Sequence, residues 1–269
     1  MDKPAFQFLD LRGKTLLLTG MTRGIGRAML PGLLAQGLRV LAVSRGIAAM
    51  EAIREEIGAD PSRLILRDCD LGDPDAVEST GRWLLEETGP IDGVLHNAAI
   101  DPRKTMEDGD QAHWLNVFQV NLFSAVSLTR HILPRLREST QGRIIFTGSV
   151  VFELGTAFLT TYAASKGAVV GLTHSLAHEL KGSGITVNCV APGAIEVEKE
   201  NLNEELNQKV IDWQSIPRRL NANDILAPVC FLLSGASGGI TAQTLTVDGG
   251  LIHPIADGVV QGRWLEEEK

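Results

Sequence analysis

The chain has 269 residues, of which 44% are hydrophobic and 22% are charged, as in an ordinary globular protein. Its formal net charge of −8 argues against nucleic acid or an anionic membrane as the main partner. No apolar run is long enough to cross a bilayer, and the N-terminal residues contain no apolar signal core. We therefore expect a cytoplasmic protein. The 3 cysteines and 6 histidines lack metal-ligand spacing, so we expect no metal site.

The N-terminal part of the chain shows a glycine loop between a strand pattern and a helix pattern. Residues 14–19 are an apolar run, which we expect to form a buried parallel strand. Residues 20–26 follow with the sequence G-M-T-R-G-I-G, and a helical pattern comes next. This is the context in which a glycine motif binds a dinucleotide. Gly20 would allow the tight turn, Gly24 the approach of the pyrophosphate, and Gly26 close packing of the helix.

The next expected strand, residues 39–43, is followed by Ser44 and Arg45, where a dinucleotide fold meets the adenosine ribose. An acidic residue at this position would accept hydrogen bonds from free ribose hydroxyls and repel a 2′-phosphate. Ser44 and Arg45, together with Arg23 of the glycine loop, instead form a candidate 2′-phosphate site. This favours NADP(H) over NAD(H). The alternative is that both arginines are solvated surface residues, which keeps NAD(H) possible.

Strand and helix patterns continue to alternate along the chain. We expect strands at 64–66, 93–95, 143–148, 185–190 and 244–247, and helices at about 48–57, 75–87, 112–136 and 224–233. This order predicts a single Rossmann-type α/β domain over residues 1–269, with a doubly wound parallel sheet and helices on both faces. Within it, residues 194–216 are expected to form a substrate lid, and residues 251–269 form a C-terminal extension.

A tyrosine and a lysine with helical spacing suggest acid/base chemistry. Tyr162, the only tyrosine of the chain, and Lys166 lie four residues apart, on one face of an expected helix. An ammonium near a phenol favours the phenolate, so we expect Lys166 to lower the pKa of Tyr162 toward the working range of a catalyst. Ser149 comes directly after an expected strand, thirteen residues before the tyrosine.

Taken together, these motifs resemble the classical short-chain dehydrogenases/reductases. The matching positions run in the family's order over roughly residues 10–251: Thr19-Gly20-x-x-x-Gly24-Ile25-Gly26, Asp70, Asn97-Ala98, Asn121, Ser149, Tyr162-x-x-x-Lys166, Pro192-Gly193 and Val247-Asp248-Gly249-Gly250. Three positions depart from the family pattern, at His96, Ala99 and Val197. The family's Asn-Asn-Ala-Gly is His96-Asn97-Ala98-Ala99 in this chain, and Val197 stands where threonine is common.

The resemblance implies an enzyme that interconverts a secondary alcohol and a ketone with NAD(P). Tyr162 would be its acid/base, Lys166 would hold the nicotinamide ribose, Ser149 the substrate oxygen, and Asn121 a water in a proton relay. The residues implied for the cofactor are Gly20, Thr22, Arg23, Gly24, Ile25, Gly26, Ser44, Arg45, Asp70, Leu71, Asn97, Ala98, Tyr162, Lys166, Pro192, Gly193 and Ile195. The resemblance also implies a homo-oligomer, commonly a tetramer.

Acidic side chains near the expected mouth of the pocket bear on the substrate. Glu196 and Glu198 begin the lid, and Glu153 follows the serine strand. Carboxylates accept hydrogen bonds from several hydroxyls, so together with Ser149 and Tyr162 they favour a sugar, a polyol or a related hydroxy compound. Alternatively, these acids are a solvated lid surface. The alternative enzyme is a 3-oxoacyl-thioester reductase acting on acyl carrier protein or CoA esters, and the non-enzymatic alternative is a dinucleotide-sensing scaffold.

Overall fold

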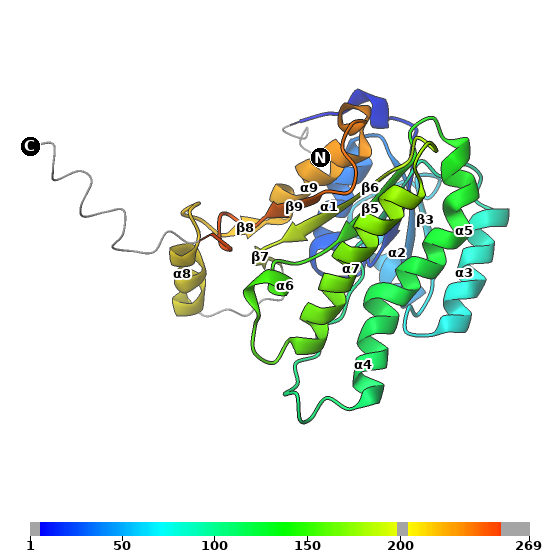
Figure 1. Ribbon diagram of the computed structural model, residues 1–269. Coiled ribbons are helices and arrows are strands. Elements are labelled where there is room, and N and C mark those ends of the chain that lie inside the picture. The colour runs from blue at the N-terminus through cyan, green and yellow to red at the C-terminus, as the bar shows by residue number, and fades with distance from the viewer. Residues whose placement is uncertain (1–5, 198–203, 254–269) are drawn as a thin grey trace, which may run out of the picture.

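The computed structural model describes residues 6–197 and 204–253, and a parallel sheet lies at its centre (Figure 1). Its strands are β1 (Thr15–Thr19), β2 (Arg39–Ser44), β3 (Leu64–Asp68), β4 (Gly93–His96), β5 (Arg143–Thr147), β6 (Thr186–Pro192) and β9 (Thr244–Val247). They form a seven-stranded sheet in the order β3-β2-β1-β4-β5-β6-β9. The order reverses between β1 and β4, which is where open α/β sheets bind their ligands. The predicted fold class is confirmed.

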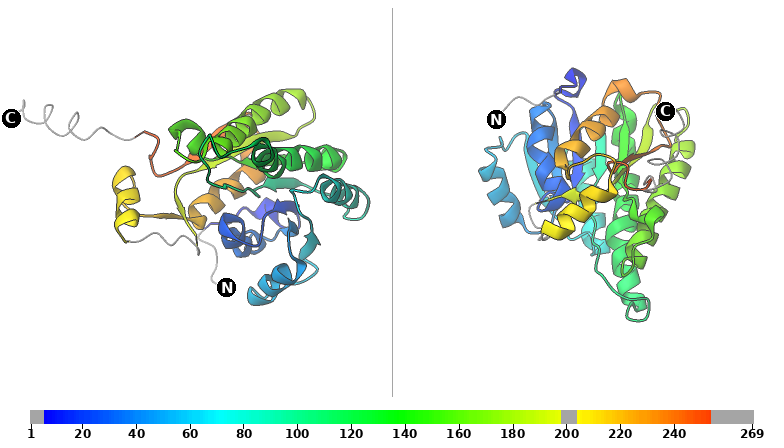
Figure 2. Two further views of the ribbon diagram at one scale, coloured as in Figure 1. Left: turned by 90° about the horizontal axis from the view of Figure 1, so that it is seen from below. Right: turned by 90° about the vertical axis from the view of Figure 1, so that its left-hand side faces the viewer.

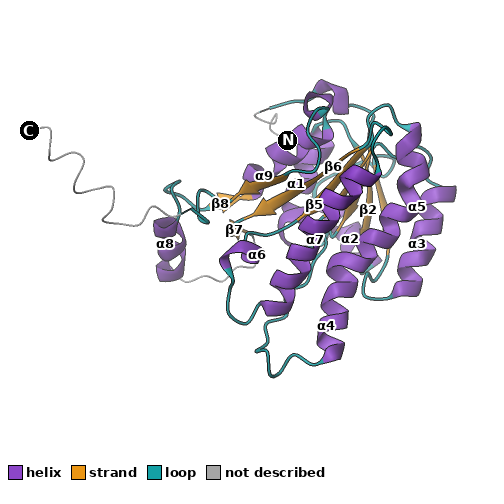
Figure 3. Cartoon of the chain, viewed as in Figure 1, coloured by secondary structure: helices purple, strands orange, loops and turns teal. Residues whose placement is uncertain are grey.

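Helices cover both faces of the sheet, as the two views of Figure 2 show. One layer contains α1 (Gly24–Ala35), α2 (Ile47–Glu56) and α9 (Ala222–Leu233). The other contains α3 (Pro74–Glu86), α4 (Gln111–Phe118), α5 (Ser124–Glu138) and α7 (Thr160–Glu179). Figure 3 shows the strands enclosed between these layers. Such enclosure explains why the strands are nearly continuous apolar runs and not alternating ones.

The buried side chains of β1 show how the two layers share one sheet. All five residues of this strand are buried. Because successive side chains point to opposite faces, Leu16 and Leu18 pack with α1 and α9, whereas Leu17 packs with α3, α5 and α7. The strand is therefore held from both sides. This arrangement holds the turn that follows it, at Gly20, in a defined position beneath the site.

The long helix expected over residues 112–136 is interrupted. A π-helical segment, Gln119–Phe123, separates α4 from α5 and contains Asn121. The Asn121 side chain bonds to both backbone groups of Ile100, a residue of the loop after β4. Single-turn π segments frequently mark functional sites. The periodicity of the sequence predicted helix here, but the tertiary contact to Ile100 was not predicted.

The expected lid consists of separate pieces. β7 (Ile195–Glu196) pairs with β8 (Leu220–Asn221), and α8 (Glu204–Trp213) lies between them in the chain. The backbone N–H groups of Ser215 and Ile216 both donate to the Gly249 carbonyl, at 2.7 and 3.0 Å, which ties the end of the lid to the loop after β9. Residues 198–203 and 254–269 lie outside the described part of the chain. Within the part that is described, no helix has both the length and the apolar character needed to span a membrane.

Candidate active site

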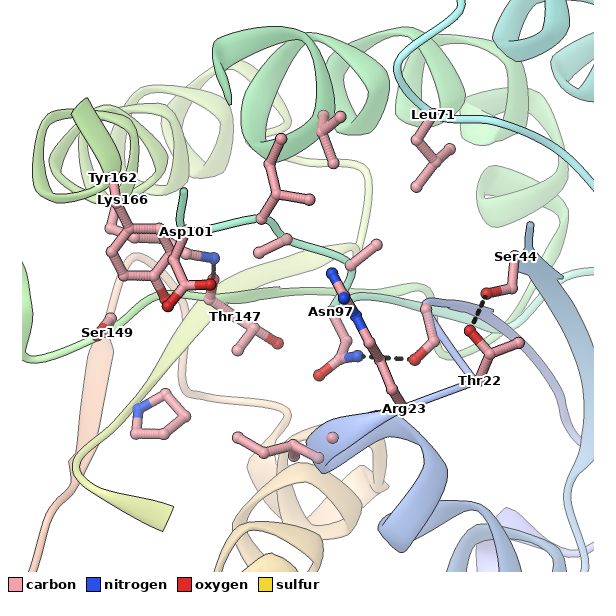
Figure 4. A pocket seen from close by; sticks show the side chains of 18 of the residues that line it. Thr22, Arg23, Ser44, Leu71, Asn97, Asp101, Thr147, Ser149, Tyr162 and Lys166 are labelled. Atoms are coloured by element: carbon pink, nitrogen blue, oxygen red, sulfur yellow. Dashed lines mark hydrogen bonds between the residues drawn. The ribbon is translucent and has the colours of Figure 1, made fainter. Parts of the chain in front are cut away.

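A cavity of about 550 Å³ opens at the carboxyl ends of the central strands. Its volume falls in the range typical of small-molecule and cofactor sites. All the residues predicted for the cofactor line it except Gly26. Of the predicted catalytic residues, Ser149, Tyr162 and Lys166 line it, and Asn121 does not. Figure 4 shows the catalytic side chains at one end of this cavity and Thr22 and Ser44 at the other.

The glycine loop has the shape that a pyrophosphate requires. Gly20 and Gly24 have φ angles of +79° and +60°, a region that favours glycine. A side chain at Gly24 would project into open space, so the backbone is accessible from the cavity. At Gly26, in contrast, a Cβ atom would overlap the Gly20 carbonyl oxygen and lie 2.5 Å from the amide nitrogen of Asn97. Gly26 thus permits close packing between α1 and the loops that follow β1 and β4.

The start of α1 can hold an anion. Among the described residues, no side chain caps this helix: its N-cap residue, Arg23, makes no capping hydrogen bond. The N–H groups of the first turn therefore need partners, and the helix dipole places positive charge at the same point. Because Arg23, Gly24 and Ile25 line the cavity, these groups fit the pyrophosphate of a dinucleotide.

The adenosine end of the cavity contains hydroxyls, two arginines and a carboxylate. The Thr22 and Ser44 hydroxyls lie 3.2 Å apart. A guanidinium nitrogen of Arg45 lies 3.8 Å from an Asp70 carboxylate oxygen, and both side chains are more than half exposed. In Figure 4 the Arg23 side chain extends across the cavity. Arg45 is therefore partly compensated by Asp70, and Arg23 adds a second cation to this end.

Strand β5 and helix α7 bring the catalytic side chains together. Ser149 lies just after β5 and is buried, and Tyr162 and Lys166 lie in the first two turns of α7. Burial raises the pKa of Tyr162 to about 12; the Ser149 hydroxyl opposes this shift and the charge of Asp101 adds to it. The pKa of Tyr162 in the folded chain is therefore raised, and not lowered as we expected from the nearby Lys166.

The Lys166 side chain is buried next to the Tyr162 ring. Its side-chain nitrogen donates to the Thr147 carbonyl at 2.6 Å and lies 5.6 Å from the centre of the Tyr162 ring. The residue is only 2% exposed. Burial lowers the pKa of Lys166 to about 8, while the nearby Cys189 and Asp101 favour its charged form. A buried ammonium with one carbonyl partner retains two N–H donors, which are available to a ribose hydroxyl.

Asn121 is buried behind the cavity, where its side chain already has several partners. Its Oδ1 accepts from the Ile100 N–H at 2.8 Å. Its amide group donates to the Ile100 carbonyl at 2.9 Å and to the Ser165 hydroxyl at 3.0 Å. Both amide hydrogens are therefore in use. The role of Asn121 in a water relay remains a prediction, and the contacts give this side chain a second role, which is to hold the loop after β4.

The carboxylates that we predicted to contact the substrate are not the ones that line the cavity. Glu153 and Glu196 are exposed, and neither lines the cavity. Glu198 lies outside the described residues. The cavity instead contains Asp101, which sequence analysis missed and which lies beside Tyr162 and Lys166 in Figure 4. A signal for it did exist, since Asp101 follows closely after the end of β4, and ligands meet such a sheet at strand ends.

Comparisons with known proteins agree with this geometry. A family model described as short chain dehydrogenase matches residues 14–208. The chain belongs to the short-chain dehydrogenase/reductase family. It is accordingly an oxidoreductase that acts on a CH–OH group with NAD(P). This confirms the predicted family and enzyme class, and it argues against the scaffold alternative.

Several members of the family resemble the chain over almost its whole length. The 3-oxoacyl-[acyl-carrier-protein] reductase FabG of Escherichia coli is 33% identical over 244 residues, which cover 90% of this chain and 99% of FabG. A candidate galactose dehydrogenase, GalD of Rhizobium meliloti, is 31% identical and covers 93% of this chain, with all of GalD matched. The crystal structure of a candidate NAD(P)-dependent gluconate 5-dehydrogenase from Beutenbergia cavernae, which contains NADP, has a TM-score of 0.84 at 31% identity and covers 91% of this chain and 98% of its own.

Proposed function

We propose that the chain is an NADP(H)-preferring oxidoreductase that interconverts a secondary alcohol and a ketone in a sugar, a polyol or a related hydroxy compound. The observation that carries the cofactor preference is the adenosine end of the cavity. Ser44, not an acidic residue, ends β2, and Arg45 and Arg23 line the cavity beside it. Guanidinium groups bind phosphate well, whereas a carboxylate at the end of β2 would repel it.

In this proposal, some residues of the cavity bind the cofactor and others orient the substrate and transfer the proton. The N–H groups at the start of α1 would hold the pyrophosphate, and Lys166 would hold the nicotinamide ribose. When it is bound, NAD(P) supplies the carbon that gives or takes hydride. Ser149 donates a hydrogen bond to the substrate oxygen, and Tyr162 gives that oxygen its phenolic proton when a ketone is reduced. The same proton returns to the Tyr162 oxygen when the alcohol is oxidised.

The pKa of Tyr162 determines how the two directions depend on pH. Because burial raises this pKa to about 12, Tyr162 is protonated near neutral pH and can act directly as the acid in reduction. Oxidation requires Tyr162 to lose its proton, either before or during the reaction. We therefore expect the rate of oxidation to rise with pH more steeply than the rate of reduction.

Two substrate classes have support. The names of GalD and of the Beutenbergia cavernae protein refer to sugar-derived substrates, and an acidic side chain, Asp101, lines the catalytic end of the cavity. The alternative is reduction of a 3-oxoacyl thioester, which the identity to FabG over nearly its whole length favours. A panel of sugars, polyols and 3-oxoacyl thioesters, assayed with the preferred cofactor, separates the two.

The cofactor preference can be measured directly with titrations of NADPH and NADH, followed by the quenching of tryptophan fluorescence. We expect NADPH to bind more tightly, and the variant Arg45→Asp to lose roughly 10- to 100-fold in NADPH affinity with little change for NADH. Arg82→Asp is the matched control, since Arg82 is an exposed arginine of α3 that does not line the cavity. If NADH binds more tightly and Arg45→Asp leaves its affinity unchanged, the arginines are solvated surface residues that do not bind the 2′-phosphate. If neither cofactor binds, the proposal is contradicted.

We also propose that the protein is a cytoplasmic homo-oligomer, a tetramer or a dimer. Helices α4 and α5 and the π segment between them expose Leu115, Phe123 and Val126 by 55%, 45% and 43%. Apolar side chains that gather on one surface commonly mark a protein interface. On α7, side chains at Gly167 and Gly171 would meet no atom within 4 Å, so this surface also leaves room for a close partner. The three cysteines are free, which suits a reducing compartment.

A further inference from the structure

We propose that Asp101 selects the substrate by charge: the cavity takes neutral hydroxy compounds and disfavours those that carry a carboxylate close to the reacting carbon. This inference rests on the proposed function, because it concerns the same cavity and the same reaction. Asp101 lines the cavity together with Ser149, Tyr162 and Lys166, and Figure 4 shows its side chain beside the last two.

The backbone at Asp101 is fixed to the catalytic helix by a chain of hydrogen bonds. The preceding residue, Ile100, is held on both its N–H and its carbonyl by the Asn121 side chain, at 2.8 and 2.9 Å. Asn121 also donates to the Ser165 hydroxyl at 3.0 Å, and that hydroxyl donates to the Tyr162 carbonyl at 2.7 Å. Because these hydrogen bonds join the loop at Ile100 to the helix of Tyr162, the backbone at Asp101 has a defined position relative to the reacting groups.

A second contact anchors the other end of this segment. The Lys104 N–H donates to the Phe158 carbonyl at 3.0 Å, which joins the loop after β4 to the loop that leads into α7. The Thr105 hydroxyl donates to a carboxylate oxygen of Asp108 at 2.6 Å and closes the turn that follows. The segment that contains Asp101 is therefore held by hydrogen bonds on both sides of this residue. Its carboxylate is exposed to the cavity and to solvent, so an incoming substrate meets it.

Charge is distributed unevenly along the cavity. Among the described lining residues, the charged side chains of Arg23, Arg45, Asp70 and Asp73 belong to the glycine loop and to the segments after β2 and β3. At the catalytic end, the charged residues are Lys166 and Asp101. Lys166 is buried and donates to a backbone carbonyl, whereas Asp101 is exposed. The accessible charge at this end is thus negative.

The electrostatic effect of Asp101 reaches the reacting groups. Its charge raises the pKa of both Tyr162 and Lys166, as expected of a carboxylate close to both. A second negative charge on the substrate, placed beside the carbon that reacts, would be repelled by the same carboxylate. Neutral hydroxyl groups can instead donate hydrogen bonds to it. The cavity therefore discriminates by the charge next to the reacting carbon.

A matched pair of ketones tests this inference. 3-Oxobutanoate and its ethyl ester contain the same ketone, but only the first is negatively charged. We expect the wild-type protein to favour the ester, and the variant Asp101→Asn to lower the ratio of kcat/KM for ester over acid by roughly 3- to 10-fold, the effect of one unit charge about 6 Å away in a hydrated site. Glu107→Gln removes a charge from the same loop but away from the cavity, and it should leave the ratio unchanged.

The dependence of this ratio on ionic strength distinguishes an effect of the Asp101 charge from a merely structural role of Asp101. Between about 0.02 M and about 0.5 M ionic strength, the wild-type ratio should fall toward that of Asp101→Asn, while the ratio of the variant stays nearly constant. If both ketones are reduced and Asp101→Asn leaves their ratio unchanged, the inference is overturned while the proposed function stands. If neither ketone is reduced, and no sugar, polyol or 3-oxoacyl thioester of the panel reacts with NADPH or NADH or with their oxidised forms, the proposed function fails and the inference fails with it.

Discussion

His96 allows a quantitative test of how burial controls charge beneath the cofactor cavity. It is the last residue of β4, where the family has asparagine, and it is 6% exposed. Its ring stacks on Phe146 with centroids 5.1 Å apart, and its Nε2 lies 2.8 Å from the Thr129 hydroxyl. Among the described residues, its Nδ1 has no hydrogen-bond partner. Burial lowers the pKa of His96 from 6.5 to about 3, so the folded protein keeps this ring neutral.

The sign and the size of the effect follow from this shift. Between pH 6.5 and pH 3 the unfolded chain binds a proton on His96 that the folded chain does not bind, so the free energy of unfolding falls as the pH falls. Each pH unit inside this window costs about 1.4 kcal/mol. At about pH 4.5, roughly two units into the window, His96 alone should therefore lower the free energy of unfolding by about 2–3 kcal/mol relative to about pH 7.5.

The variant His96→Asn isolates this contribution. Urea unfolding at one protein concentration, at about pH 7.5 and about pH 4.5, gives the free energy of unfolding of each protein. Any constant cost of losing the Thr129 contact cancels in the difference between the two pH values. We expect the wild-type protein to lose about 2–3 kcal/mol more than His96→Asn, and the exposed control His174→Asn to behave as the wild type. Equal losses in all three proteins would refute the claim that a buried neutral His96 makes the fold acid-sensitive.

Two further variants test the catalytic and the glycine positions. Tyr162→Phe should retain NADPH binding by tryptophan fluorescence but lose roughly 10²- to 10⁴-fold in kcat, because the proton donor is gone; near-normal turnover would contradict the role of Tyr162. Gly26→Ala should weaken NADPH binding and lower the melting temperature, because its Cβ would overlap the Gly20 carbonyl oxygen. Gly239→Ala is its control outside the cavity and the α7 surface, with nothing within 4 Å of the added atom, and it should leave both quantities nearly unchanged. Similar melting temperatures for the two alanine variants would show that α1 and the loop can separate at little cost.

Local sequence patterns were enough to predict the fold and most of the residues that line one end of the cavity. The apolar run before Gly20 predicted β1, because a strand enclosed between two helix layers is buried on both faces. The glycines of residues 20–26 predicted the loop and the close approach of α1, since both depend on the backbone of those residues alone. The spacing of Tyr162 and Lys166 placed both on one helix.

The tertiary structure alone decided the charge and the surroundings of the catalytic groups. Burial, which depends on residues far apart in the chain, raises the pKa of Tyr162, whereas the spacing of Tyr162 and Lys166 had predicted a lower value. The π segment at Asn121 has a helical sequence, but its side chain is held by Ile100, a contact that no local pattern contains. For the same reason, the sequence pointed to Glu153 and Glu196 at the pocket mouth, whereas the folded chain brings the carboxylate of Asp101 into the cavity. Which acid faces the substrate depends on how the loops cross the sheet, and that is a property of the packed chain.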